Sequence, residues 1–235
     1  MTFVKDALVV LTYVILFVKL HVEVTTMQID RKKLSEMFIA TARLMKANTE
    51  ILSSIDSKFG DGDHGVTIGR IADLIVEHAE NLASSDITFK LFFSKLGDAV
   101  TNVGGGSAGP LYGTYFEGFG EGLDDQTVMD VTLFKKVIHS ALDNLESITK
   151  ARVGDKTMMD TLIPATDAII NASGDLPEVV HAGCEAAIAG AKASEGFVSK
   201  FGRARFYKEA TIGTPDAGAV SCTYIFIGFD EAINQ

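Results

Sequence analysis

The chain has 235 residues, of which 47% are hydrophobic and 22% are charged, and its formal net charge is −10. This length and composition suit a globular protein with one domain or at most two. The acidic balance argues against nucleic acid as the main partner, because neutralising phosphates requires clustered lysine and arginine. The two cysteines lie in apolar helical patterns and indicate no disulfide framework, which favours a cytoplasmic protein.

The first 26 residues differ in character from the rest. Residues 7–18 read ALVVLTYVILFV, which is strongly apolar but shorter than the roughly 20 residues that a membrane span needs. No small-residue cleavage site follows them, which argues against a signal peptide. We therefore expect residues 1–26 to be an extension outside the core and residues 27–235 to form the functional domain. A membrane anchor and a packed β-like segment are the alternatives for residues 7–18.

From residue 30 onward, apolar residues recur every three or four positions, which is the period of amphipathic helices. Eight such stripes follow one another, at residues 34–52, 68–82, 89–100, 111–119, 134–148, 162–172, 180–191 and 222–233. No alternating strand pattern occurs in this part of the sequence. Short connections predict antiparallel neighbours. We therefore expect an all-α fold, an eight-helix antiparallel up-and-down bundle or barrel.

Four of the connections are rich in glycine, aspartate and other functional residues. They follow the first, third, fifth and seventh expected helices, at residues 56–65, 103–110, 151–157 and 202–218. In an up-and-down bundle, alternate connections lie at the same end. We therefore expect these four to form one composite site at one end of the bundle.

The first connection contains three aspartates, Asp56, Asp61 and Asp63, separated by glycines and followed by His64. Magnesium takes oxygen ligands and is usually held by a few carboxylates together with substrate phosphates. Carboxylates packed this closely repel one another unless a cation or protonation relieves them. The pattern indicates a metal site, and a solvated acidic turn is the alternative.

The other connections supply groups that suit an anion. The run from Gly104 to Gly109 lets backbone N–H groups approach an anion at the start of a helix, although it matches neither a Walker A loop nor a dinucleotide fingerprint. Arg203 is a candidate for stabilising charge on a transferred phosphoryl group, or else a solvated surface arginine. His64 suits a phosphate donor or a local cap, and Asp155 is also explained as the N-cap of the sixth helix.

Four ordered motifs carry a resemblance to a known family. They are GDGDHG at 60–65, VGGGSAGPLYGT at 103–114, GDKTM at 154–158 and DAGA at 216–219. Together they resemble the nucleotide-binding L subunit of dihydroxyacetone kinases, the DhaL family, over residues 30–235. The resemblance implies an eight-helix α-barrel with ADP or ATP and two Mg²⁺ ions at one end. It also implies a DhaK-like partner that holds the keto-sugar, and rephosphorylation of bound ADP by a phosphohistidine protein of the phosphotransferase system.

The resemblance also implies roles for individual residues. The metal ligands would be Asp56, Asp61 and Asp63, and Arg203 would be the catalytic residue. The nucleotide contacts would be His64, Gly65, Val66, Thr67, Ser107, Ala108, Thr149, Met158, Arg203, Asp216, Ala217 and Gly218. The chain departs from the family pattern in a glycine loop one residue longer and in Ile148-Thr149, where an Arg-Gly pair is usual.

The expected function is therefore the nucleotide-binding subunit of a dihydroxyacetone-type kinase, a phosphotransferase. One alternative is a kinase subunit for another ketose, such as a tetrulose. A non-catalytic ADP-binding regulatory module is the alternative from a different functional class.

Overall fold

The computed structural model of the chain describes residues 27–234. The apolar stretch at residues 7–18 lies outside this part, so the expectations for it stay predictions. Among the described residues, none of the helices is both long enough and apolar enough to cross a membrane.

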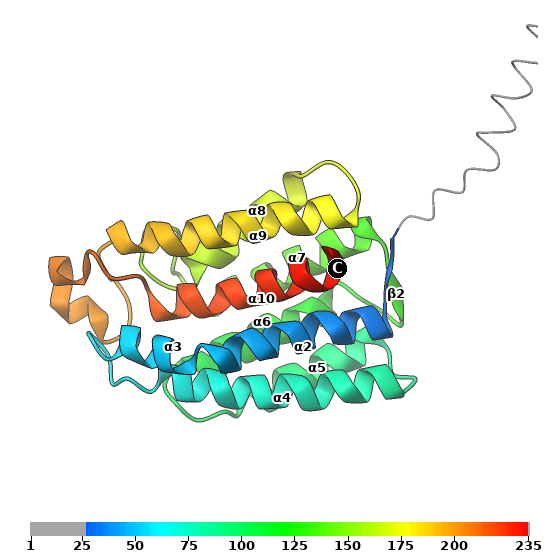
Figure 1. The fold of residues 1–235 in the computed structure, drawn as a ribbon, viewed down its shortest axis with the longest axis horizontal. Coiled ribbons are helices and arrows are strands. Elements are labelled where there is room, and N and C mark those ends of the chain that lie inside the picture. The colour runs from blue at the N-terminus through cyan, green and yellow to red at the C-terminus, as the bar shows by residue number, and fades with distance from the viewer. Residues whose placement is uncertain (1–26, 235) are drawn as a thin grey trace, which may run out of the picture.

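Nine α-helices make up most of the described chain. They are α2 (Arg31–Ala47), α3 (Thr49–Asp56), α4 (His64–Ser84), α5 (Phe89–Thr101), α6 (Ala108–Glu121), α7 (Val131–Glu146), α8 (Met159–Asn171), α9 (Leu176–Ala193) and α10 (Ala217–Asn234). From α4 to α10 each helix packs against the next one in sequence, α2 packs against α4, and α10 returns to pack against α2. The ring is thereby closed, with α3 continuing α2, and the predicted all-α barrel is confirmed (Figure 1).

Two local features differ from the expectation. The first expected helix is divided into α2 and α3 at Asn48, whose side-chain amide donates a hydrogen bond to the Leu44 carbonyl at 2.8 Å. Asparagine competes in this way with the helical pattern of backbone hydrogen bonds. A short antiparallel pair also joins β1 (Ile29–Asp30) to β2 (Val128–Met129), although no strand was expected after residue 30.

The barrel interior is filled by aromatic side chains. The Phe38 ring on α2 lies 5.3 to 6.2 Å, centroid to centroid, from five other phenylalanine rings on α5, α6 and α10. All of these rings are buried. Edge-to-face and offset aromatic pairs contribute about 0.5–1.5 kcal/mol each beyond their burial. This packing fixes the helices against one another and therefore fixes the ends from which the connections project.

Two helix N-termini at one end of the barrel lack the side-chain caps that are found at the other end. The helices α2, α5, α7 and α9 begin at one end, and each is capped by a side chain, from Asp30, Thr88, Asp130 and Asp175 respectively. The helices α4 and α6 begin at the opposite end, and neither carries a side-chain cap. Uncapped first turns leave N–H groups and a partial positive charge available to an anion.

Candidate functional site

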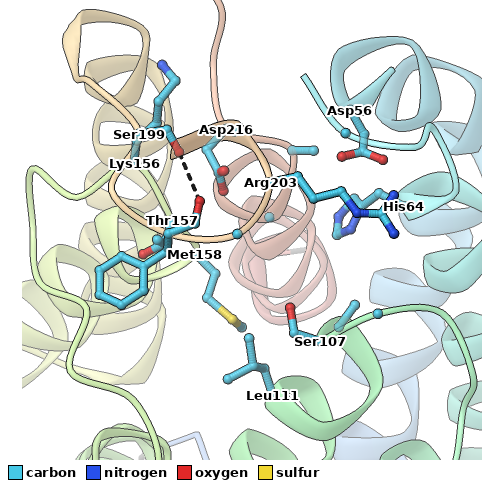
Figure 2. Close-up of a pocket in the computed structure, with 18 of the residues that line it drawn as sticks. Asp56, His64, Ser107, Leu111, Lys156, Thr157, Met158, Ser199, Arg203 and Asp216 are labelled. Carbon is cyan, nitrogen blue, oxygen red and sulfur yellow. Dashed lines mark hydrogen bonds between the residues drawn. The ribbon is translucent and has the colours of Figure 1, made fainter. Parts of the chain in front are cut away.

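A pocket of about 550 Å³ opens at the end of the barrel where α4 and α6 begin. Residues of all four expected connections line it, including Asp56, Ser107, Lys156 and Arg203 (Figure 2). This volume lies in the range of small-molecule sites. The prediction that alternate connections meet at one end of the barrel is therefore confirmed.

Three carboxylates meet at one side of this pocket. Asp56 ends α3, and Asp61 and Asp63 lie in the connection to α4. One carboxylate oxygen from each residue lies within 4.8 Å of the others. Opposite ligands of an octahedral Mg²⁺ ion are about 4.2 Å apart, since each bond is about 2.1 Å. The oxygen-only donor set and its spacing therefore fit Mg²⁺.

The backbone of this connection is shaped around Asp56. The N–H of Gly62 donates to a carboxylate oxygen of Asp56 at 2.8 Å. Gly62 has φ = 75°, a conformation that a residue with a side chain rarely adopts. Burial, followed by the charge of Asp61, raises the pKa of Asp63 above its ordinary value. A bound cation would relieve this repulsion.

Arg203 lies directly beside the carboxylates. Its guanidinium forms an ion pair with the Asp61 carboxylate, and Figure 2 shows the side chain extending toward Asp56 and His64. A second contact joins the same two connections, because the Phe59 and Tyr207 rings lie 5.3 Å apart. The connection after α9 therefore rests on the connection after α3.

The glycine loop forms another wall, through Ser107 and Ala108 at the start of α6. Gly105 has φ = 127°, and a Cβ atom placed there would lie 2.1 Å from the Thr67 hydroxyl oxygen. Thr67 therefore packs beneath the loop instead of lining the pocket. Gly65 and Val66 also lie outside the lining, and Val66 is 54% exposed.

The remaining expected nucleotide contacts line a less charged side. Figure 2 shows Met158 and Leu111 approaching each other below Asp216, away from Asp56. Thr149 and the first residues of α10, Ala217 and Gly218, complete this side. The pocket therefore offers an apolar region beside a region with carboxylates and free helix N-termini. This arrangement suits a ligand with a flat apolar group and an anionic tail.

His64 is the first residue of α4, and its ring forms a hydrogen bond with a residue of α10. Its Nε2 atom lies 2.9 Å from the Ser221 hydroxyl, which lies 2.7 Å from the Tyr112 hydroxyl, and Cys222 donates to the same tyrosine oxygen at 3.2 Å. Burial lowers the pKa of His64 and so favours the neutral ring. The histidine is positioned by this buried chain of hydrogen bonds.

The lining residues that sequence reasoning missed include Lys156, Thr157, Ser199 and Phe201. Lys156 and Thr157 lie inside the GDKTM motif, which was the one available signal for them. Ser199 and Phe201 precede the glycine of the fourth connection and carry no comparable pattern.

The alternative explanation of Asp155 as a helix cap is wrong. The helix α8 begins at Met159, and Asp155 instead accepts hydrogen bonds from the Arg152 N–H at 2.8 Å and from the Lys200 ammonium at 2.6 Å. The buried Asp160 carboxylate organises the turn, because it accepts from the N–H groups of Gly154 and Thr157, both at 2.6 Å.

Asp216→Asn is expected to make unfolding less dependent on pH. Burial raises the pKa of Asp216 to about 7, above the value of about 3.9 for an unfolded aspartate. Between these values the folded state keeps a proton that the unfolded state has lost. The free energy of unfolding contributed by Asp216 therefore falls as the pH rises from about 4 to about 7.

The amide oxygen of asparagine can still accept the Ala219 N–H, which Asp216 accepts at 2.8 Å. The variant should therefore gain stability relative to the wild type as the pH rises through this window. Denaturant unfolding of both proteins at about pH 5 and about pH 8 measures this change. A difference in stability that is the same at both pH values would contradict it.

The part of the sequence that forms this pocket matches a known family of domains. Residues 58–231 match the family model described as the DAK2 domain. The chain belongs to the DAK2 domain family. Its resemblance to DhaL subunits is also confirmed by a curated relative from Listeria innocua, the ADP-binding subunit DhaL of PEP-dependent dihydroxyacetone kinase 1. That relative is 32% identical, over 77% of this chain and 86% of its own length.

Two longer kinases are also similar to this chain. The L-erythrulose kinase of Pectobacterium atrosepticum is 29% identical over 83% of this chain, which spans 34% of that protein. The solved dihydroxyacetone kinase of C. freundii shares the fold, with a TM-score of 0.64 and 24% identity, over 84% of this chain and 34% of its own. That kinase has also been solved in complex with AMP-PNP and Mg²⁺.

Proposed function

We propose that this DAK2 protein binds ADP or ATP with Mg²⁺ and serves as the nucleotide-binding subunit of a dihydroxyacetone-type kinase. The observation that carries the proposal is one pocket holding both the Asp56, Asp61 and Asp63 cluster and two uncapped helix N-termini. The carboxylates suit a cation and the helix N-termini suit phosphates, so the pair suits a metal-bound polyphosphate. The relative named as an ADP-binding subunit supports the same ligand.

Each part of the pocket then has a proposed role. The three aspartates hold Mg²⁺, in one or two ions, and bound Mg²⁺ neutralises charge on the phosphoryl group that is transferred. The first turns of α4 and α6 direct N–H groups at the phosphates through His64 and Ala108, which line the pocket. Gly65 and Val66 follow His64 in the first turn of α4 but lie outside the lining, so their proposed contribution is limited to the partial positive charge of that helix N-terminus.

The proposed contacts of the base and ribose lie on the less charged side. There Met158 and Leu111 offer an apolar surface, and Thr149 and Asp216 offer polar groups. Arg203 stabilises charge on the phosphoryl group during transfer. Thr67 supports the glycine loop from beneath, as the Gly105 geometry indicates.

The proposed partner is a DhaK-like subunit that holds the keto-sugar. Support comes from the relative that is itself named as one subunit of a kinase. The term PEP-dependent in that name also supports a phosphohistidine protein of the phosphotransferase system as the phosphoryl donor. The erythrulose kinase relative favours a second candidate substrate, a four-carbon ketose.

Titration calorimetry with ADP in the presence and absence of Mg²⁺ tests the proposed ligand. The wild type is expected to bind ADP tightly only with Mg²⁺, and Asp125→Asn, an exposed aspartate between α6 and α7, should bind equally well. Transfer to dihydroxyacetone or erythrulose, measured with an added DhaK-type subunit, then separates the two substrates. A wild-type protein that binds no nucleotide with Mg²⁺ would overturn the proposal.

A further inference from the structure

The connection after α9 is a long loop whose two ends meet. The Gly213 N–H donates to the Glu195 carbonyl at 2.7 Å, and the Asp216 N–H donates to the Ser194 hydroxyl at 3.0 Å. Compact surface loops with joined ends often carry function. Residues 195–213, here named the Arg203 loop, bring Phe201 and Arg203 to the pocket.

Lys156 lies at the neck of this loop. Its ammonium donates to the Ser194 carbonyl and to the Thr214 carbonyl, both at 2.5 Å, so it bridges the two ends. The residue is only 4% exposed, although lysine is almost never fully buried unless it is paired. Its backbone has φ = 59°, which is uncommon for any residue other than glycine. Residues held in sparsely populated backbone conformations cluster at functional sites.

A second lysine, Lys135, also donates to two backbone carbonyls and serves as a comparison. Lys135 donates to the carbonyls of Ile170 at 3.3 Å and Ala172 at 2.6 Å, at the C-terminal end of α8. Those two acceptors are neighbours in one chain segment, and cations commonly satisfy the last carbonyls of a helix. The acceptors of Lys156 lie on opposite ends of a loop instead. Lys156 therefore adds a side-chain bridge to the two hydrogen bonds that already join the ends of the loop.

The far part of the Arg203 loop is held separately. The Arg203–Asp61 ion pair and the Phe59–Tyr207 contact fix it to the connection after α3. We propose that Lys156 is a positioning residue, which clasps the neck of the Arg203 loop and thereby holds Arg203 at the phosphate side of the pocket. This inference rests on the proposed function for its effect on turnover, but not for its effect on the loop.

Limited trypsin digestion of the nucleotide-free protein tests the clasp without any activity assay. Cleavage after Arg203 and Arg205, followed by mass spectrometry, reports how often the loop opens. Lys156→Met should be cleaved there about tenfold faster than the wild type, and Lys135→Met should be cleaved at the wild-type rate. Equal rates in Lys156→Met and the wild type would overturn the clasp. If the methionine variant does not fold, Lys156→Arg takes its place, because it keeps the charge but alters the two short contacts.

A double-mutant cycle tests whether Lys156 acts through Arg203. In the wild-type background, Lys156→Met should lower turnover about tenfold, and in the Arg203→Ala background it should cost less than about twofold. An equal cost in both backgrounds would show a general structural role and overturn the inference. If the wild type transfers no phosphate, the proposed function fails, and the trypsin result alone then decides the clasp.

Discussion

Arg203→Ala is expected to lower turnover by about 10³-fold, since an arginine acting on a transferred phosphoryl group is worth at least this much in other phosphotransferases. Arg203 lines the pocket beside the proposed metal cluster and pairs with Asp61. If it acts mainly in the transition state, affinity for ADP with Mg²⁺ should change only a few-fold. Steady-state kinetics with a DhaK-type subunit, together with calorimetry, separates the two effects.

Arg205 provides the matched control for this experiment. Its guanidinium lies 4.7 Å from the centre of the Phe206 ring, and it is not part of the pocket lining. Arg205→Ala should leave turnover nearly unchanged. Because Arg205 is two residues away and could replace Arg203, the double variant is measured as well. Turnover that survives both single changes and the double change would show that Arg203 has no role at the phosphate.

Asp63→Asn is expected to abolish Mg²⁺-dependent nucleotide binding and, with it, kinase activity. The change keeps the size of the side chain but removes one charge that the cation needs. Burial and then repulsion by Asp61 raise the pKa of Asp63, and the change removes the charge that both oppose, so the metal-free protein should melt at a slightly higher temperature than the wild type. Loss of binding together with a gain in stability distinguishes a ligand from a structural aspartate.

The measurement is thermal unfolding with and without Mg²⁺ and ADP, supported by circular dichroism. The wild type and Asp125→Asn should gain melting temperature when both ligands are added, because ligands that bind only the folded state stabilise it. Asp63→Asn and Asp61→Asn should gain none, while their helicity stays near that of the wild type. Full activity in Asp63→Asn would remove the metal assignment.

The barrel could be predicted from the sequence because its signals are long and periodic. Stripes of buried side chains such as Phe38 and Met45 mark each helix over several turns. The parity of the connections then placed four of them at one end without any knowledge of the structure. The division at Asn48 and the pairing of Ile29 with Met129 were missed, because one or two residues are too few to form a pattern.

The site could be predicted only as far as its local motifs extend. Asp56, Asp61 and Asp63 are close in sequence, so their meeting in space follows from a short loop. The ion pair of Asp61 with Arg203 joins residues 142 positions apart, and no local pattern indicates it. The burial of Lys156 could not be predicted from a local pattern either, because its two acceptors lie 38 and 58 residues away along the chain.

The two ends of the described chain lie far from the pocket. Ile29 is paired with Met129 at the opposite end of the barrel, and the 18-residue helix α10 runs from Ala217 at the pocket to Asn234, a length of about 27 Å (Figure 1). A domain joined at either end would need about eight extended residues merely to span that length. In the L-erythrulose kinase relative, the matched part is about a third of the protein. If that part has the same fold, the segment that joins it to the rest of the protein must cover the same length to reach the pocket. An affinity handle placed after Asn234 would conversely hold this protein on a sensor surface with its pocket facing the solution.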